Sequence, residues 1–299
     1  MSISCFGASI TKQKKGYAFY LQKLFKKNIN THGFGSEHLV YGGVVHIDKV
    51  LKNKPSLCFI DWFTTGWVDK PVLKEKNILA LETIKYKFSI NNCKIIFLFL
   101  PKKDHHDRIE FYNLLKEYLN FNNISFIDVN EHLTYNDKVL KDSDKILRDG
   151  IHTTDYGAAK YANIIFNEYN NMKIKSPINL QKTKFCDVRE LKINKIFKKE
   201  LELKGNCHVL ACSLQIGPNS GYLKINNELN LLWDQWCHFL RSCSKLNFIV
   251  KDKCEIKILD KEVDYSSCRR DFNFNNVQFE LNLLSIYYIG DSLEFVKGS

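Results

Sequence analysis

The chain has 299 residues, of which 44% are hydrophobic and 13% aromatic, so it can build a substantial core and is neither disordered nor fibrous. Its formal net charge of +11 at pH 7 is compatible with an anionic polysaccharide, membrane surface or nucleic acid as partner, and equally with the lysine-rich codon usage of an AT-rich genome. The longest apolar run, residues 95–100, is far below the ~18 residues of a transmembrane helix, which excludes a membrane span.

The first half of the chain alternates short apolar runs with amphipathic helical patterns, which is typical of β-α units. We predict strands over 2–9, 57–63, 94–101 and 124–129. We predict helices over 16–27, 46–51, 70–89, 108–121 and 156–169, with a glycine-containing loop between the first helix and the second. Because parallel crossovers are almost always right-handed, this order predicts a three-layer α/β/α domain with its site at the carboxyl ends of the strands.

The pattern of apolar residues changes from about Lys173 onward. The polar segment 176–184 indicates a linker. Short apolar runs then predominate, separated by turn residues at intervals of about 8 to 12 residues. This spacing predicts an antiparallel β-sandwich or jelly roll. We therefore divide the chain into an α/β domain, residues 1–172, and a β-rich accessory domain, residues 173–299.

The ten cysteines include no C-x-x-C pair, so a zinc site has no support in the sequence. Several of them lie in apolar, strand-like runs, where a free thiol behaves as a small hydrophobe. The N-terminus lacks the basic region and apolar stretch of a secretory signal. These features predict reduced thiols and a cytoplasmic location, and we expect no metal and no cofactor.

Ser9, in the run C-F-G-A-S-I-T, has the placement that a serine nucleophile needs. It follows a predicted strand, Gly7 permits a tight turn, and a helix begins soon after. That arrangement exposes the hydroxyl and lets backbone N–H groups meet a developing oxyanion. The alternative is that Ser9 only caps a helix.

Asp149 and His152 lie three residues apart in R-D-G-I-H-T-T-D-Y-G-A-A-K-Y-A, just before the last predicted helix. An aspartate that accepts a hydrogen bond from the imidazole Nδ1 fixes the tautomer and leaves Nε2 to take a serine proton. The pattern predicts a triad of Ser9, Asp149 and His152. The alternative is that Asp149 or Thr153 caps the helix and His152 is a surface loop residue.

Taken together, G-A-S at residues 7–9 and D-G-I-H-T-T-D-Y-G-A-A-K-Y-A from Asp149 resemble the first and last sequence blocks of the SGNH/GDSL hydrolase superfamily. The resemblance covers residues 1 to about 170 and implies a flavodoxin-like three-layer fold. It also implies that Ser9 is the nucleophile, His152 the base and Asp149 its orienting partner. The opening block departs from G-D-S at Ala8, a position outside the triad.

The middle blocks of that superfamily supply an oxyanion hole through a glycine N–H and an asparagine side chain, in addition to the N–H of the nucleophile. The resemblance best matches Gly35 to the glycine, with Gly33 and Gly42 as alternatives. Where the family shows G-x-N-D, this chain has I-D-W-F-T-T-G-W, which puts Thr64 or Thr65 in place of the asparagine. We take Thr64 as the substitute hydroxyl donor. Loss of one such donor lowers the rate of an esterase by ~100- to 1,000-fold.

Two further groups of residues have alternative interpretations. His105 and His106, flanked by Asp104 and Asp107, either ligate a metal or form a solvated loop. Adjacent histidines point in different directions, which favours the loop. Asp61, at the end of a predicted strand, either tunes the site or is a turn residue.

The function that we expect is hydrolysis or transfer of an ester-linked acyl group, most simply acetyl, on a carbohydrate or polysaccharide precursor through an acyl-enzyme. Trp233, Trp236 and Tyr222 either stack on sugar rings or belong to the core of the second domain. The alternative function is a catalytically degenerate protein of this fold that binds or assembles glycans. No motif interleaves basic and aromatic residues as single-strand recognition requires, so we expect no specific nucleic-acid partner.

Overall fold

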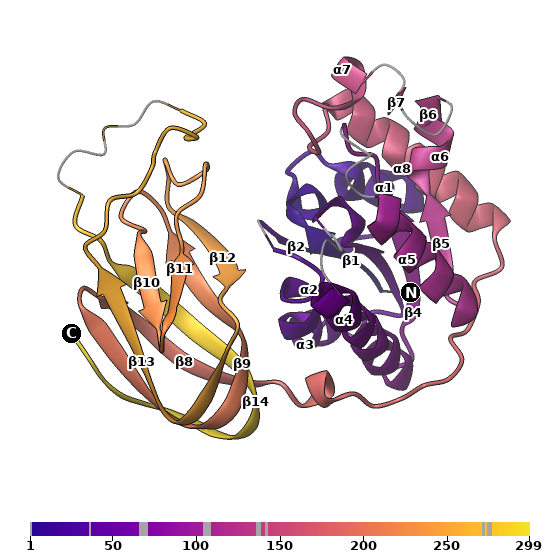
Figure 1. Cartoon of the computed structure of the whole chain (residues 1–299). Coiled ribbons are helices and arrows are strands. Elements are labelled where there is room, and N and C mark those ends of the chain that lie inside the picture. The colour runs from indigo at the N-terminus through magenta and orange to yellow at the C-terminus, as the bar shows by residue number, and fades with distance from the viewer. Residues whose placement is uncertain are drawn as a thin grey trace. The chain divides into compact units, whose positions relative to one another are not determined.

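The structure is a computed structural model that describes residues 2–35, 37–65, 71–103, 109–135, 139–140, 143–270, 273 and 277–299. Two compact units make up the chain, Met1–Cys186 and Asp187–Ser299 (Figure 1). The segment 173–186 belongs with the first unit because it packs on the long helix of that unit: Lys85 donates to the carbonyl oxygen of Asn179 at 2.9 Å. The composition changes at Lys173, whereas the contacts divide the chain after Cys186.

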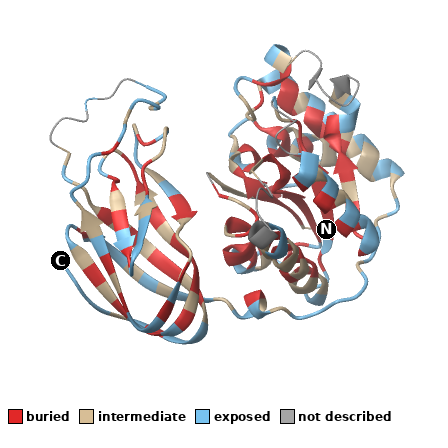
Figure 2. Ribbon diagram, in the orientation of Figure 1, coloured by how far each residue is buried: buried red, intermediate tan, exposed pale blue. Residues whose placement is uncertain are grey.

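A parallel sheet of five strands, in the order β2-β1-β3-β4-β5, forms the centre of the N-terminal unit. The strands are β1 Ile3–Ala8, β2 Ile29–Phe34, β3 Leu57–Asp61, β4 Lys94–Phe99 and β5 Ser125–Asp128. Every residue of β1 and β3 is buried (Figure 2). Burial on both faces is what a parallel sheet covered by helices requires, and it explains the continuous apolar runs in the sequence.

Helices cover both faces of this sheet, so the predicted three-layer α/β/α fold is confirmed. The described helical segments of the chain are η1 Ser9–Lys12, α1 Tyr17–Phe25, α2 Gly42–Val45, α3 Ile47–Leu51, η2 Phe63–Thr65, α4 Pro71–Ile90, α5 Ile109–Phe121, α6 Val129–Leu133, α7 Ser143–Ile146, α8 Asp155–Asn171 and η4 Lys184–Asp187. Helices α1 and α8 pack on one face, where Leu21 and Tyr161 join Phe59 of β3 in one apolar cluster. Helix α4 lies on the other face, where Phe88 contacts Phe6 of β1. A short hairpin pairs β6 Thr134–Tyr135 with β7 Val139–Leu140.

The prediction of a loop between the first two helices was wrong for residues 29–34, which form β2 beside β1, and for residues 42–45, which form the short helix α2. Only Ile29 of this strand is buried. An exposed edge strand has no apolar run or alternation to mark it, and its backbone hydrogen bonds to β1 decide the conformation.

The C-terminal unit is antiparallel β structure, as the spacing of its apolar runs predicts, and its seven described strands belong to one hydrogen-bonded sheet. The strands are β8 Arg189–Phe197, β9 Glu200–Ile216, β10 Tyr222–Ile225, β11 Glu228–Leu231, β12 Arg241–Lys245, β13 Phe248–Leu259 and β14 Leu281–Gly298. Strand β9 is central: it pairs along one side with β13 and then β12, and along the other with β14. A register shift at Gly290, whose φ of 130° suits glycine alone, interrupts the long pairing with β14.

Buried and exposed residues alternate along the strands of this unit (Figure 2). One face supplies the core, which includes Leu203, Leu214 and Ile286. All ten cysteines lie in the described part of the chain and all are free, eight of them buried. Among the described residues, no helix combines the length and apolarity needed to span a bilayer.

Candidate active site

Ser9 lies at the carboxyl end of the central strand β1, as its position in the sequence predicts. Strand β1 ends at Ala8, and Ser9 is the first residue of the turn η1. Ala8 pairs with Phe34 of β2, and Gly7 pairs with Asp61 of β3. The segments that follow β2 and β3 therefore start on either side of Ser9, about 4.8 Å away in the hydrogen-bonding direction.

The structure brings the three predicted triad residues together. Ser9 Oγ lies 2.8 Å from His152 Nε2, although the two residues are 143 positions apart in the chain. His152 Nδ1 lies 2.9 Å from Asp149 Oδ2. With the proton on Nδ1, the imidazole donates to Asp149 and Nε2 accepts from the Ser9 hydroxyl, which is the arrangement of a serine nucleophile with its base.

The other carboxylate oxygen of Asp149 is also engaged. Asp149 Oδ1 accepts from the N–H groups of His152, at 2.7 Å, and of Ile151, at 2.9 Å. Partial burial acts to raise the pKa of Asp149, but these two N–H groups and the imidazole outweigh it and lower the pKa below its ordinary value. Asp149 therefore stays ionised and keeps the orientation of the ring.

Helix α8 does not use Asp149 or Thr153 as its N-cap, so the capping alternative is wrong. The cap is Thr154, whose side-chain oxygen accepts from the N–H of Gly157 at 3.0 Å. The turn before it closes through a hydrogen bond from the N–H of Arg148 to the carbonyl oxygen of His152, at 2.9 Å.

Gln13 joins the nucleophile segment to the histidine segment, and no sequence pattern marked it. Its Nε2 donates to the carbonyl oxygen of Thr153 at 2.7 Å, and its Oε1 accepts from the N–H and hydroxyl of Thr153 at 3.2 and 3.3 Å. Thr153 is only 1% exposed and follows His152 directly. These bonds hold the backbone beside His152 against the turn that begins at Ser9.

The geometry separates the three glycines proposed for the oxyanion hole. A Cβ on Gly33 would lie 2.4 Å from the backbone nitrogen of Lys12, so Gly33 lets the turn η1 pack against β2. Gly42 lies in the buried helix α2, and a Cβ on it would lie 2.2 Å from Glu37 Oε2. Gly35 alone faces open space, with Lys12 Nζ at 4.0 Å, and it follows the strand pair of Ala8. The contacts therefore explain Gly33 and Gly42 by close packing, and the role of Gly35 as an N–H donor of the oxyanion hole stays a prediction.

The two threonines after β3 differ in what their hydroxyls contact. The Thr64 hydroxyl donates to both carboxylate oxygens of Asp61 at 3.4 Å, so it is already engaged, and its role as an oxyanion donor stays a prediction. The Thr65 hydroxyl is buried and has no partner among the described residues. Its loop is held by His38, whose Nδ1 donates to the Thr65 carbonyl oxygen. An unused, buried donor makes Thr65 the better candidate.

Asp61 is a fully buried carboxyl at the end of β3. Burial raises its pKa to about 7, although the hydrogen bonds from Thr64 act to lower it. The buried hydroxyls of Tyr17 and Tyr161 are near enough for the negative charge on Asp61 to raise their pKa values further. Asp61 thus belongs to a buried polar layer beside β1 and is not an exposed turn residue.

The possible metal ligands His105 and His106, with Asp104 and Asp107, lie outside the described residues. The segment just before them reaches the triad turn, because the N–H of Lys103 donates to the carbonyl oxygen of Gly150 at 2.9 Å.

The aromatic residues singled out in the second unit separate into core and surface. Trp233 is 5% exposed and packs against Tyr265, so it belongs to the core. Trp236 is 39% exposed and lies under the guanidinium of Arg269, 5.4 Å from the ring centre. Tyr222, which is half-buried, lies under Lys261.

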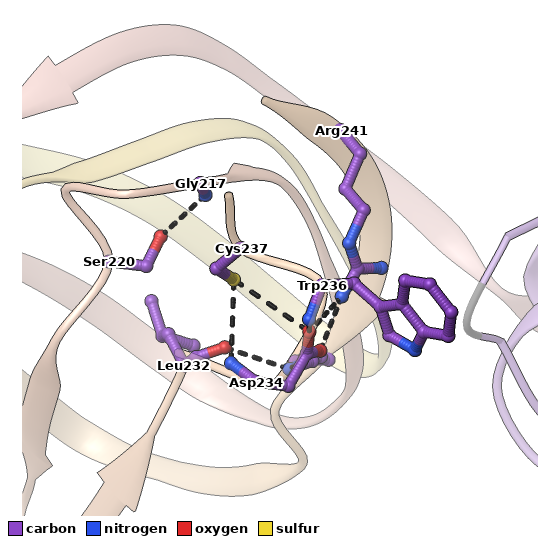
Figure 3. Close-up of polar contacts among 8 residues, drawn as sticks. Gly217, Ser220, Leu232, Asp234, Trp236, Cys237 and Arg241 are labelled. Atoms are coloured by element: carbon purple, nitrogen blue, oxygen red, sulfur yellow. Dashed lines mark hydrogen bonds and ion pairs between the residues drawn. The ribbon is translucent and has the colours of Figure 1, made fainter. Parts of the chain in front are cut away.

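A polar cluster around Asp234 holds the loop that carries Trp236 (Figure 3). The Asp234 carboxylate accepts from the guanidinium of Arg241, from Lys245 Nζ at 3.1 Å and from the N–H of Trp236 at 3.1 Å. The cations outweigh partial burial and lower the pKa of Asp234. The cluster fixes the loop backbone while the indole of Trp236 projects from it (Figure 3).

Comparison with solved structures places this architecture among known folds. Over 98% of its length the chain is similar to a two-domain esterase active on acetylated mannans, co-crystallised with mannopentaose, at 12% identity, 91% coverage of that chain and a TM-score of 0.66. A second structure of a two-domain esterase active on acetylated mannans gives 11% identity, 100% and 92% coverage and a TM-score of 0.64.

The N-terminal part alone is similar to a protein from Desulfitobacterium hafniense DCB-2 described as a lipolytic protein of the G-D-S-L family. That match has 17% identity, covers 56% of this chain and 98% of the other, and has a TM-score of 0.50. Neither a protein-family model nor a curated protein sequence matches the chain. The resemblance to the SGNH/GDSL superfamily is thus confirmed at the level of the fold, with a separate antiparallel β unit after the α/β unit.

Proposed function

We propose that this protein is a serine esterase that cleaves small acyl esters of carbohydrates through an acyl-enzyme. The observation that carries the proposal is the hydrogen-bonded chain from Ser9 Oγ through His152 to Asp149 at the carboxyl end of β1. The likeness of the whole chain to two-domain esterases that act on acetylated mannans supports the choice of carbohydrate esters. Transfer of the acyl group to a sugar hydroxyl is the second fate of the same intermediate.

The reaction begins when His152 Nε2 takes the hydroxyl proton of Ser9 and Oγ attacks the ester carbonyl carbon. Negative charge develops on the carbonyl oxygen, where the N–H groups of Ser9 and Gly35 and the hydroxyl of Thr65 are the candidate donors. The C–O bond to the sugar then breaks, and His152 returns its proton to the departing sugar oxygen. Water or an acceptor hydroxyl, deprotonated by His152, attacks the acyl-enzyme and frees Ser9.

Hydrolysis of p-nitrophenyl acetate by wild type, Ser9→Ala and His152→Ala, with and without a glycan acceptor, tests the proposal. We expect both substitutions to abolish turnover above the spontaneous rate. Acceleration by the acceptor, with acetylated glycan as product, identifies a transferase. Wild-type turnover equal to that of both variants contradicts the esterase proposal and supports the degenerate glycan-binding alternative.

For the C-terminal unit we propose glycan binding at Trp236. Its exposed indole on a loop fixed by Asp234 is the observation that favours this function, because a rigid aromatic face suits the C–H surface of a sugar ring. Titration with mannopentaose, followed by tryptophan fluorescence, tests it. We expect saturable quenching in wild type and none in Trp236→Ala. Equal quenching in both proteins rules out Trp236 as the contact.

A further inference from the structure

A cavity of about 530 Å³ opens at the nucleophile, and its walls are strongly basic. Ser9 and His152 line it together with four cationic residues: Lys12, Lys14, Lys15 and Arg148. The three lysines come from the turn after Ser9, and Arg148 comes from the segment before Asp149. The cations therefore approach the reacting hydroxyl from both segments that build the triad.

One of these four cations is neutralised inside the cavity. Lys15 Nζ lies 3.2 Å from the carboxylate of Asp155, which also lines the cavity. The exposed side chains of Lys12, Lys14 and Arg148 have no anionic partner among the described residues. Three positive charges thus remain without a counterion beside Ser9.

Lys12 has the closest defined relation to the reaction centre. It ends the turn that Ser9 begins, and its Nζ lies 4.0 Å from the Cβ position of Gly35, the glycine predicted for the oxyanion hole. A negatively charged group bound by Lys12 therefore lies next to the acyl group that Ser9 attacks.

The residues that line the cavity are all polar or charged. No phenylalanine, tyrosine, tryptophan, leucine, isoleucine or valine is among the described residues that line it, so its apolar surface comes from the stems of long polar side chains and from the His152 ring. The three free cations among them suit a charged oxygen group.

We infer that the natural ester is an anionic glycan unit, a sugar that carries a carboxylate or a phosphate close to the acylated hydroxyl. The inference rests on the proposed esterase function and defines its substrate class. Arg148 presents a planar fork that matches the paired oxygens of either anion, and Lys12 and Lys14 add point charges. The shared chemistry is a negatively charged oxygen group, and the two sources are separated by experiment.

The test compares three acetyl esters that differ at one position. They are methyl glucoside, methyl glucuronide and methyl glucoside 6-phosphate, each acetylated at O3, so that position 6 is neutral, a carboxylate or a phosphate. We expect kcat/KM to be at least about tenfold higher for one or both anionic esters, since each exposed charge pair changes binding by about threefold. The preferred anion identifies the source. The advantage disappears at about 1 M salt, where the Debye length is about 3 Å.

Lys14→Gln, Arg148→Gln and their combination locate the effect, each assayed on the charged and the neutral ester. We expect the ratio of the two rates to fall about threefold for each charge removed. Lys27→Gln, the same change in an exposed lysine before the amino end of β2, is the matched control and leaves the ratio unchanged. Lys14→Glu, at an exposed position without hydrogen bonds, provides a second variant that keeps its fold and lowers the ratio further.

Equal rates for all three esters, with no effect of salt, overturn the inference and leave the esterase itself intact. The same holds if the variants leave the charged-to-neutral ratio unchanged. No turnover of any acetyl ester contradicts the proposed function instead. The two failures are therefore distinguishable.

Discussion

The parallel sheet of the N-terminal unit and the antiparallel sheet of the C-terminal unit distribute their polar side chains differently. Strands β1 and β3 are buried on both faces, so polar groups gather where these strands end, as Ser9 and Asp61 do. Strand β9 alternates buried and exposed residues along much of its length, and in its unit a half-buried ion cluster joins Asp234 of a loop to Arg241 and Lys245 of β12. A parallel sheet thus concentrates reactive groups at the carboxyl ends of its strands, whereas an antiparallel sheet can expose one face to solvent. The same kind of substitution should therefore affect activity in one unit and only folding or binding in the other.

The largest expected effect lies in the first unit. His152→Ala removes the base and leaves the Ser9 hydroxyl with its proton, so kcat on p-nitrophenyl acetate should fall by roughly 10⁴-fold or more. Steady-state hydrolysis measures it. A loss below tenfold, in a variant with the wild-type circular dichroism spectrum, contradicts the role of His152 as the base.

Asp61 makes the stability of the first unit depend on pH. Its pKa of about 7 in the fold lies above the ordinary 3.8, so the folded state holds the proton more tightly than the unfolded chain. The contribution of Asp61 to the free energy of unfolding is full below about pH 4 and is lost as the pH rises toward 7. The loss amounts to up to about 4 kcal/mol, because each unit of pKa difference corresponds to about 1.36 kcal/mol. Asp61→Asn should remove this dependence and be the more stable protein at pH 9. Urea unfolding at pH 4 and pH 9 measures it, and parallel pH dependence in both proteins shows that Asp61 is not the source.

Asp234→Ala tests whether a substitution in the second unit affects folding without affecting activity. It leaves Arg241 and Lys245 without their shared carboxylate, which should destabilise the unit by about 2 kcal/mol. Ester hydrolysis should not change, because no residue of the triad lies in this unit. Thermal unfolding and p-nitrophenyl acetate turnover, measured on the same sample, check both halves. A fall in kcat while the protein is folded would show that the second unit also contributes to ester hydrolysis.

The smallest effect is expected for Gln13→Ala. It removes three hydrogen bonds to Thr153 and lets the histidine segment shift relative to Ser9, so kcat should fall roughly tenfold with KM unchanged. Gln13→Glu turns a carboxylate oxygen toward the Thr153 carbonyl oxygen in place of the donor, and should lower kcat at least as much as alanine. A change in KM with kcat intact indicates a contact with substrate and contradicts a positioning role.

The sequence predicts those features of the fold and the site that have a local residue pattern. The apolar runs of β1, β3, β4 and β5 mark buried strands, and D-x-x-H before α8 marks two members of the predicted triad. Strand β2 was not predicted, because Ile29 is its only buried residue. An edge strand depends on backbone pairing, which side-chain patterns do not report.

Other features depend on contacts between distant segments, and no single-sequence pattern contains them. Gln13 is one of many polar residues until the fold places it on Thr153. The choice of Gly35 over Gly33 rests on the approach of Lys12 to β2. The basic cavity likewise needs Arg148 to lie in the same cavity as Lys12 and Lys14, and only the fold brings these distant segments together.

Covalent labelling with diisopropyl fluorophosphate tests whether Ser9 is a nucleophile activated by His152. Ser9 Oγ attacks phosphorus, fluoride leaves, and the intact mass rises by one diisopropylphosphoryl group. We expect one label per chain, mapped to the peptide that contains Ser9, with none in Ser9→Ala and much slower labelling in His152→Ala. Labelling at another residue, or none in a folded wild-type protein, would contradict it.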